Sequence, residues 1–417
     1  MPSSNSATVQ DLIAALPKTD LHVHLDGSLR LSSLIELAAA AGVELPSKTE
    51  EGLREKVFKP NYRNLGEYLE GFRYTVAVLQ TKESLERATY ELCEDAWKEG
   101  VCYLEIRFAP QLHVSPKLSL DEVVKSVAAG IARAERTFNA EERVVKGEWP
   151  VFRAGIIFCA LRMFMPEFSA CYRGYFDACG YSPRNEVFAR AGLDLARAAA
   201  HLKIVEGLPV VGFDLAGQEK GYPADTHEEA FQVVHEAFLG KTVHAGEDYG
   251  PESIFMAIGD LHADRIGHGT WLLDPQRISD KSIPDPAGYI ERLAQYVADR
   301  RITIEVCLTS NQQTVPELAG DLKHHPFGQF VRRRLSTTIA TDNRLVSNTT
   351  VTRELLRAVT TFSLSKKELH DILTYGFKRS FFPGRYLDKR AYVRHVIDVM
   401  DRVFDSFDAD RLLPGHG

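Results

Sequence analysis

Residues 19–27 read Thr-Asp-Leu-His-Val-His-Leu-Asp-Gly, and the rest of the fold prediction builds outward from this alternating run. Apolar side chains at every second position are typical of a β-strand, and Asp-Gly is a turn-forming pair. The same alternation turns His22 and His24 toward one side. The run therefore predicts a strand, 19–24, that carries polar side chains to its C-terminal end.

Seven further short apolar runs have the composition of strands, and long helical patterns separate them. The predicted strands are 101–108, 154–161, 210–215, 242–245, 265–267, 302–306 and 337–341, and examples of the helices are 31–41, 84–99 and 119–138. Strands that alternate with helices are typical of βαβ units and a parallel sheet. With eight strands in total, the sequence predicts an α/β fold, a (β/α)8 TIM barrel with additional peripheral helices.

A doubly wound open sheet would produce the same alternation, so the barrel needs a second argument, and polar residues at strand ends supply it. His244 and Glu247 follow the fifth predicted strand, His268 the sixth, and Asp342 and Asn343 the eighth. In (β/α)8 barrels, residues from distant strands meet at the C-terminal rim. The barrel is therefore the favoured architecture.

The chain is expected to form a single domain over 1–417, because no Pro/Gly/Ser-rich linker, repeat or low-complexity tract divides it. A short lead, 1–10, comes before the first helix. A hydrophobic content of 44% is enough to fill a sizeable core. One large catalytic domain is the simplest organisation.

A capping box from Ser365 to Glu368 begins a helical tail, 365–417, which is expected to pack against the outside of the barrel. A similar box from Ser119 to Glu122 begins one of the barrel helices. Both boxes place an acceptor side chain at the helix start, where backbone N–H groups have no partner inside the helix.

The composition argues against polyanionic and membrane partners. The net charge is −7 and the pI about 6.1, so phosphate backbones and anionic lipids would not be attracted. We find no signal peptide and no apolar run that spans a bilayer. Six cysteines form no C-x-x-C pair and are expected to be buried thiols, which suits a cytoplasmic location. They are Cys93, Cys102, Cys159, Cys171, Cys179 and Cys307.

Each candidate residue has an ordinary explanation when it is considered alone. Two histidines in an H-x-H run are often satisfied core residues, Glu247 could be a solvated loop acid, and Asp342 a helix cap. Imidazole nitrogens are, however, good ligands for Zn²⁺. Because all these groups come directly after predicted barrel strands, a shared metal site explains them better than coincidence does.

Other catalytic motifs are missing. A second class of zinc deaminases pairs H-x-E with P-C-x-x-C, and this chain has no such cysteine pair. There is also no phosphate-binding P-loop, no G-x-G-x-x-G fingerprint and no G-x-S-x-G elbow.

Several motifs together resemble one known family. They are Leu-His-Val-His-Leu-Asp-Gly at 21–27, Tyr-Leu-Glu-Ile-Arg-Phe-Ala-Pro at 103–110, Asp-Leu-Ala-Gly at 214–217, His-Ala-Gly-Glu at 244–247, Arg-Ile-Gly-His-Gly at 265–269, Ser-Asn at 310–311 and Thr-Asp at 341–342. In type and in order they resemble the adenosine deaminases and their relatives among the metal-dependent amidohydrolase-type barrels. The resemblance covers nearly the whole chain.

The resemblance implies one zinc ion per chain, held by His22, His24, His244 and Asp342. A water molecule or hydroxide would occupy the remaining position, because bound Zn²⁺ lowers the pKa of water to roughly 7. That hydroxide would attack C6 of a purine.

The resemblance also implies three catalytic roles. Glu247 would be a protonated acid that supplies a proton to ring atom N1 as C6 becomes tetrahedral, and burial would raise its pKa. His268 would orient the hydroxide and stabilise the charge on its oxygen. Asp342 would accept the water proton as well as bind the metal.

Substrate contacts are expected from His24, Asp26, Gly217 and Asn343. In the family, the position of Gly217 presents a backbone N–H to purine N3, and that of Asp26 faces the ribose 5′-hydroxyl. Asn343 departs from the usual pattern, which has a second Asp that bonds N7. An amide NH₂ can still donate to N7.

The leading hypothesis is hydrolytic deamination of adenosine or 2′-deoxyadenosine to the corresponding inosine, with release of ammonia. Alternatives keep the chemistry but change the 5′ side, as in aminodeoxyfutalosine, methylthioadenosine or AMP. An aromatic-rich stretch, 142–181, could reshape that side of the site. A metal-dependent amide or ester hydrolase, or a binding protein without catalysis, remains possible on the same barrel. The oligomeric state cannot be predicted.

Overall fold

Eight parallel strands run in chain order through one sheet of the computed structural model, which describes residues 7–63 and 65–414. All eight predicted strands are present, with bounds that differ from those expected by at most two residues. They are β1 (Lys18–His24), β2 (Val101–Phe108), β3 (Arg153–Leu161), β4 (Val210–Ala216), β5 (Gly240–Ala245), β6 (Arg265–His268), β7 (Thr303–Val306) and β8 (Thr337–Ile339).

The sheet closes on itself between β1 and the residues that follow β8. The His24 N–H donates to the Asp342 carbonyl at 2.8 Å, and the Asp342 N–H donates to the His22 carbonyl at 2.8 Å. These two bonds form a parallel bridge between Val23 and Asp342. The predicted (β/α)8 barrel is therefore confirmed.

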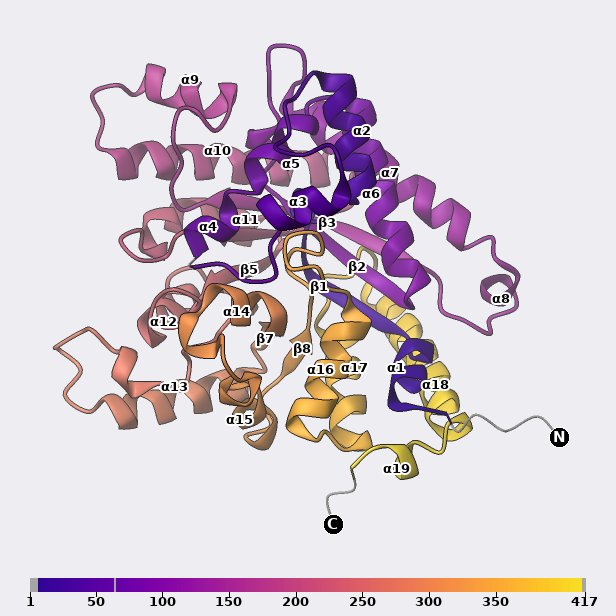
Figure 1. Cartoon of the computed structure of the whole chain (residues 1–417). Coiled ribbons are helices and arrows are strands. Elements are labelled where there is room, and N and C mark those ends of the chain that lie inside the picture. Colours follow the sequence, from indigo (N-terminus) through magenta and orange to yellow (C-terminus); the bar gives the residue numbers. More distant parts are fainter. Residues whose placement is uncertain (1–6, 64, 415–417) are drawn as a thin grey trace.

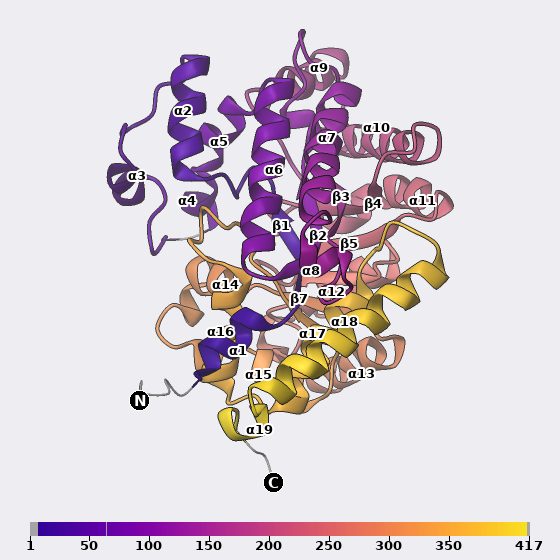
Figure 2. The same cartoon turned by 90° about the vertical axis from the view of Figure 1, so that its right-hand side faces the viewer.

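Helices surround the sheet in both views (Figures 1 and 2). The predicted helices 31–41, 84–99 and 119–138 correspond to α2, α6 and α7. The α-helices are α1 (Val9–Ala15), α2 (Leu31–Ala41), α3 (Glu50–Lys56), α4 (Leu65–Leu69), α5 (Phe72–Val78), α6 (Lys82–Lys98), α7 (Leu120–Phe138), α8 (Glu142–Val145), α9 (Ala170–Ala178), α10 (Arg184–Ile204), α11 (Glu228–Glu236), α12 (Pro251–Gly259), α13 (Pro286–Arg300), α14 (Leu308–Thr314), α15 (Phe327–Arg332), α16 (Val351–Phe362), α17 (Lys366–Arg379), α18 (Tyr386–Ser406) and α19 (Ala409–Leu412).

The segment between β1 and α6 is longer than a simple barrel connection and contains α2 to α5. Figure 2 shows these four helices grouped at one side of the barrel, well away from the C-terminal helix α18. Side chains of α4 and α5 line the same cavity as the residues at the strand ends. This insertion therefore covers part of the barrel mouth.

The C-terminal tail packs on the barrel exterior, as its sequence suggests. Ser365 and Glu368 form the predicted capping box, and the helix that they begin, α17, packs against β8 and β1. Ser119 and Glu122 form the second predicted box. Residues 1–6 of the expected lead and 415–417 of the tail lie outside the described residues, and α1 begins within the lead at Val9.

Charged residues fill the inside of the barrel below the strand ends. Arg265 on β6 donates from Nε to Glu305 on β7 at 2.6 Å and also pairs with Glu105 on β2. Arg107 on β2 donates to Glu305 at 2.9 Å. All four side chains are buried. Because each charge has an opposite partner, the barrel can hold them without an uncompensated buried ion.

The cysteines and the helices agree with most of the sequence expectations. All six cysteines are free thiols, but Cys171 and Cys179 are half-buried on the exterior helix α9 and its end, so the expectation that all six are buried is wrong for these two. No helix of the described residues is long and apolar enough to cross a membrane. The cytoplasmic location stays a prediction.

Removal of Arg265 tests the interior charge network. We expect Arg265→Met to lower the free energy of unfolding by about 3–5 kcal/mol, because Glu105 would lose its guanidinium partner in a buried place. A matched control is Arg333→Met, which breaks an exposed pair with Glu291 and should cost less than about 1 kcal/mol. Urea unfolding of both variants measures the difference, and equal losses would contradict the role of burial.

Candidate active site

Five predicted side chains meet at the C-terminal ends of the strands. His24 is the last residue of β1, and His22 lies two residues before it. His244 lies near the end of β5, His268 is the last residue of β6, and Asp342 follows β8. Nε2 of His22 and Nε2 of His24 each lie 3.5 Å from Oδ1 of Asp342. Nε2 of His24 lies 3.3 Å from Nε2 of His244. The closed barrel thus brings together residues that are more than three hundred positions apart in the chain.

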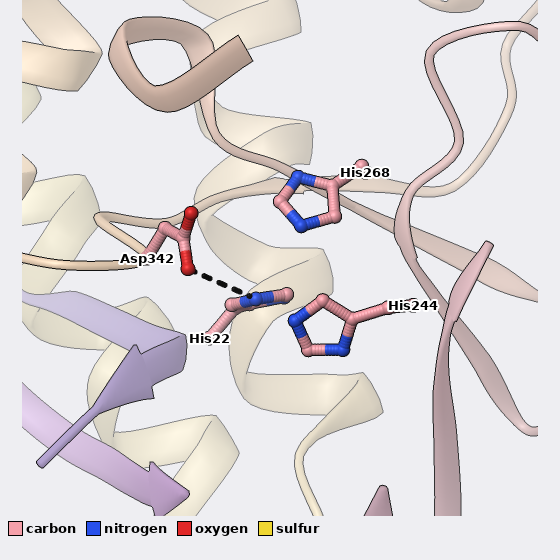
Figure 3. A group of neighbouring side chains, drawn as sticks. All are labelled: His22, His244, His268 and Asp342. Atoms are coloured by element: carbon pink, nitrogen blue, oxygen red, sulfur yellow. Dashed lines mark ion pairs between the residues drawn. The ribbon is translucent and has the colours of Figure 1, made fainter. Parts of the chain in front are cut away.

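Four of these residues offer ligand atoms within 4.8 Å of one another, namely His22, His244, His268 and Asp342. Figure 3 shows their side chains directed toward a common space, with the pair between Asp342 and His22 marked. The sequence prediction has His24 in place of His268 in the metal set. Both histidines lie close to the cluster, so the position of the groups alone leaves two possible sets of ligands.

Buried carboxylates orient two of the histidines. Nδ1 of His22 lies 2.8 Å from Oε2 of Glu305, and Nδ1 of His244 lies 3.0 Å from Oδ2 of Asp214. Burial opposes ionisation of Glu305, but the guanidinium groups of Arg107 and Arg265 outweigh it and hold its pKa well below the usual range. An ionised carboxylate only accepts, so each of these histidines donates from Nδ1, and a neutral ring in this orientation presents the lone pair of Nε2 to the cluster.

The arrangement fits a metal cation. Nε2 of His22 is buried and has no hydrogen-bond partner among the described residues. Nε2 of His24 lies 3.3 Å from Nε2 of His244 and 3.5 Å from Oδ1 of Asp342. Converging lone pairs repel each other unless a cation lies between them. Three imidazoles and one carboxylate are a donor set that suits zinc.

Two site residues adopt the left-handed backbone conformation, His268 with φ 65° and Asp342 with φ 61°. This region is uncommon for residues other than glycine and is frequent at functional sites. Gly267 is needed for close packing, since a Cβ there would lie 3.0 Å from Cε1 of His22. The glycine beside His268 therefore permits the close packing of the His22 ring.

Glu247 lies at the edge of the cluster. Its Oε2 is 3.5 Å from Nε2 of His268, and its Oε1 accepts from the Thr314 hydroxyl at 3.2 Å. Burial, followed by the negative charges of Asp342 and Glu219, raises the pKa of Glu247 well above the ordinary value of glutamate. The expected protonated carboxyl is physically reasonable at this position.

A second carboxylate, Glu219, holds the loop that carries Glu247. The Glu219 carboxylate accepts hydrogen bonds from the backbone N–H groups of Gly246, Glu247 and Asp248 at 2.8–3.1 Å. It also accepts one from the Ser253 hydroxyl at 2.5 Å. It is buried. Glu219 thus fixes the position of Glu247 through its backbone.

A cavity of about 830 Å³ opens beside the cluster, and the predicted substrate-contact residues line it. Oδ1 of Asp26 is buried without a partner among the described residues, and burial raises the pKa of Asp26 to about 7. Gly217 has φ 96°, a conformation that favours glycine. Nδ2 of Asn343 donates to the Tyr68 hydroxyl at 2.9 Å, which leaves its second amide hydrogen for a ligand.

The outer part of the cavity is mainly apolar and has little positive charge. The apolar lining residues are Leu65, Leu69, Phe72, Val76, Ala77, Leu112, Val114, Leu161, Met163 and Phe168. Arg73 is the only Lys or Arg among the described residues of the lining, and Glu70 and Glu167 lie on the same rim. All three are exposed. The lining suits an uncharged ligand.

Several residues of the site had no predicted role. Asp214, Glu305, Arg107 and Glu219 orient the histidines or the Glu247 loop from positions that sequence alone does not connect. One signal was available, since charged residues inside apolar strand runs, such as Arg107 in 101–108, are costly to bury without a purpose. The partner of each such charge could not be read from the chain.

Comparison with known proteins decides the family. A family model described as adenosine deaminase matches residues 17–167 and 187–399. A protein of Mycobacteroides abscessus named adenosine deaminase is 35% identical over 373 residues, 89% of this chain and 92% of the relative. The chain belongs to the adenosine deaminase family. It is a hydrolytic deaminase, as the resemblance of its motifs predicted.

Solved structures agree on the fold of this deaminase. An adenine deaminase from Arthrobacter aurescens has a TM-score of 0.71 at 23% identity, with 93% of this chain and 100% of the other covered. An amidohydrolase from Burkholderia ambifaria with bound zinc has a TM-score of 0.72 at 18% identity, with 98% of each chain covered. At these identities the two structures support the barrel alone.

Part of the predicted aromatic-rich stretch lies outside the family match. The unmatched residues, 168–186, contain α9 and supply Phe168, Ser169 and Ala170 to the cavity. Tyr172 of α9 packs on Phe164 with ring centroids 4.0 Å apart. This segment shapes the outer cavity in a way that the family pattern does not specify.

Glu219 provides a test of how the loop is held. We expect Glu219→Ala to lower turnover by about 10²-fold, because the loop that carries Glu247 would shift when three N–H groups lose their acceptor. Ser253→Ala is the matched control, since it removes only a hydroxyl from the same carboxylate and should cost at most about 1.5 kcal/mol of stability with turnover retained. Steady-state kinetics and urea unfolding check both variants. Normal turnover in Glu219→Ala would contradict the anchoring role.

Proposed function

We propose that this deaminase converts adenosine and 2′-deoxyadenosine to the corresponding inosines with release of ammonia, and that it uses one zinc ion per chain. The observation that carries the proposal is a buried carboxyl of raised pKa, Glu247, placed beside a cluster of converging lone pairs at the base of a mainly apolar cavity. An acid next to a metal site is what attack on an aromatic amidine requires.

The proposed zinc ligands are His22, His24, His244 and Asp342. The orientation of His22 and His244 by buried carboxylates supports this set, as does the Ser310 hydroxyl, which donates to Oδ2 of Asp342 at 2.5 Å and leaves Oδ1 toward the histidines. When bound, zinc supplies an activated water as the nucleophile at neutral pH.

Glu247 serves as the general acid. The purine ring resists attack at C6 unless N1 gains a proton, and a protonated Glu247 can donate one. One oxygen of Glu247 lies 3.2 Å from the Thr314 hydroxyl, and the other lies 3.5 Å from Nε2 of His268. His268 faces the reacting oxygen and stabilises the charge on it. Asp342, in addition to its role as a ligand, accepts the proton of the attacking water.

The substrate contacts follow from the lining of the cavity. His24 is half-buried and reaches the cavity from the metal cluster, and Gly217 allows the purine edge to approach its backbone. The second amide hydrogen of Asn343 is directed to N7. Asp26 takes the 5′-hydroxyl, which would give its unpartnered oxygen a donor.

Charge favours a nucleoside over a nucleotide. A 5′-phosphate needs several basic groups for charge-assisted hydrogen bonds. The described lining offers one exposed arginine, Arg73, against two exposed acids, Glu70 and Glu167, and the buried Asp26. A phosphate next to these carboxylates would be repelled.

An amide or ester hydrolase on the same barrel is less well supported. Hydrolases of that kind often use a second metal with a bridging lysine carboxylate, and no lysine is among the described residues that line the cavity. Such a reaction also has no need for the buried acid Glu247.

Two variants separate the proposed roles of acid and ligand. We expect Glu247→Gln to keep zinc and lose at least about 10²-fold in turnover, because an amide cannot transfer the proton. His22→Ala should lose zinc and activity together. Metal analysis and ammonia release on the purified variants provide the check. Full activity of either variant would refute the role assigned to it.

The pH dependence of Glu247→Gln gives a second measurement of the same acid. The folded pKa of Glu247 is raised, so its contribution to stability is present at low pH and is lost as the pH rises toward the folded value. The free energy of unfolding of Glu247→Gln, relative to that of the parent protein, should therefore rise as the pH increases from the ordinary pKa of glutamate to the raised folded value, and stay level above it.

A substrate panel tests specificity. We expect adenosine and 2′-deoxyadenosine to release ammonia with similar kcat/KM, and AMP to react at least about 10²-fold more slowly because of the acidic rim. Methylthioadenosine and aminodeoxyfutalosine complete the panel. If AMP proved the better substrate, the charge argument would be wrong, whereas ammonia release would still support the chemistry.

A further inference from the structure

A chain of buried hydrogen bonds leads away from His268 on the side opposite to the cavity. Nδ1 of His268 lies 3.0 Å from Nδ2 of Asn311 on α14, and Oδ1 of Asn311 lies 3.2 Å from Nε2 of His325. The backbone N–H of Phe327 then donates to Nδ1 of His325 at 3.1 Å. His268, Asn311 and His325 are each at most 2% exposed. Solvent therefore has little access to these hydrogen bonds.

The backbone N–H of Phe327, at the far end of this series of hydrogen bonds, fixes the direction of each of them. A backbone N–H can only donate, so Nδ1 of His325 accepts, and the single proton of the neutral ring is on Nε2. Nε2 of His325 then donates to Asn311, which must turn its carbonyl oxygen toward it. The NH₂ group of Asn311 consequently faces Nδ1 of His268, which accepts.

Burial agrees with the protonation state that the bond directions give for His325. Burial lowers the pKa of His325 to about 3, so the ring is neutral and carries one proton. The deduction depends on the bond directions alone, and it does not depend on which way the Asn311 amide is drawn, since the Phe327 N–H fixes it.

We propose that Asn311 and His325 are positioning residues that hold His268 as the neutral tautomer with its proton on Nε2, the atom that faces Glu247 and the cavity. His268 is then a hydrogen-bond donor to the reacting oxygen and is neither a proton-accepting base nor a metal ligand through that atom. The catalytic meaning of this tautomer depends on the proposed function, whereas the tautomer itself does not.

The proposal also decides between the two possible sets of metal ligands. A nitrogen that carries a proton has no lone pair for a cation, so Nε2 of His268 cannot replace Nε2 of His24. The carboxylates that orient His22 and His244 accept a hydrogen bond from Nδ1, whereas the amide that orients His268 donates a hydrogen bond to Nδ1. The second partner thus distinguishes His22 and His244, which are oriented as ligands, from His268, which is oriented as a hydrogen-bond donor.

Asn311→Asp reverses the hydrogen bond between residue 311 and Nδ1 of His268, with almost no change in the shape of the side chain. A carboxylate can only accept, so the neutral ring of His268 would place its proton on Nδ1 and leave Nε2 unprotonated. We expect kcat for adenosine to fall by about 10²-fold, with KM and zinc content little changed, because one donor to the developing charge is lost. Gln312→Glu is the matched control: this neighbour on α14 pairs with Arg357, so the same change in chemistry leaves His268 as it was.

The tautomer is measured directly on the zinc-loaded parent protein by ¹⁵N NMR with labelled histidine, and His268→Gln assigns the signals. We expect a protonated Nε2 and an unprotonated Nδ1 for His268, and the opposite in Asn311→Asp. A proton on Nδ1 in the parent protein would overturn the proposal even if no variant folds. Normal kcat in Asn311→Asp with the tautomer reversed would overturn the positioning role. The expected tautomer in a protein without ammonia release would refute the proposed function alone.

Discussion

Two backbone hydrogen bonds between the end of β1 and Asp342 close the barrel, and the active site depends on this closure. They place His22, His24 and Asp342 next to one another although the chain between them is almost the whole protein. Since side chains on parallel strands point the same way at matched positions, the closure also sets which atoms face each other. The left-handed backbone at Asp342 then turns its carboxylate toward the histidines. A metal site made of distant residues requires this geometry before any ligand arrives.

Electrostatics inside the barrel divides the carboxyl groups into two kinds. Glu305 and Asp214 lie among arginines and histidines that hold their pKa values low, so they stay ionised and orient the imidazoles. Glu247 is buried near other negative charges, and its pKa is raised. Groups of the same chemical type therefore become structural anions or a proton donor according to their neighbours. A similar division extends to three of the histidines, because the proposed ligands His22 and His244 have a carboxylate partner and the proposed donor His268 has an amide partner.

The outer lining of the cavity comes from parts of the molecule outside the barrel strands. Helices α4 and α5 and the segment 168–186 supply much of the apolar outer lining. The family match omits the segment 168–186. Loops on a rigid barrel can vary without disturbing the metal cluster. Asn343, a proposed substrate contact, departs from the Asp of the family pattern described above, and its bond to Tyr68 on α4 ties that difference to the same insertion.

The sequence by itself determined the eight strands, the polar residues at their ends, the two capping boxes and the family, because alternation, capping and motif order are local properties of the chain. His22, His244 and Glu247 could be proposed for the site on that basis. Only the tertiary structure decided which charges meet. The anchoring of the Glu247 loop by Glu219, the guanidinium of Arg107 between two carboxylates, and the bonds from His325 through Asn311 to His268 all join separate strands and loops. Their partners depend on barrel closure and on burial, which no local pattern encodes.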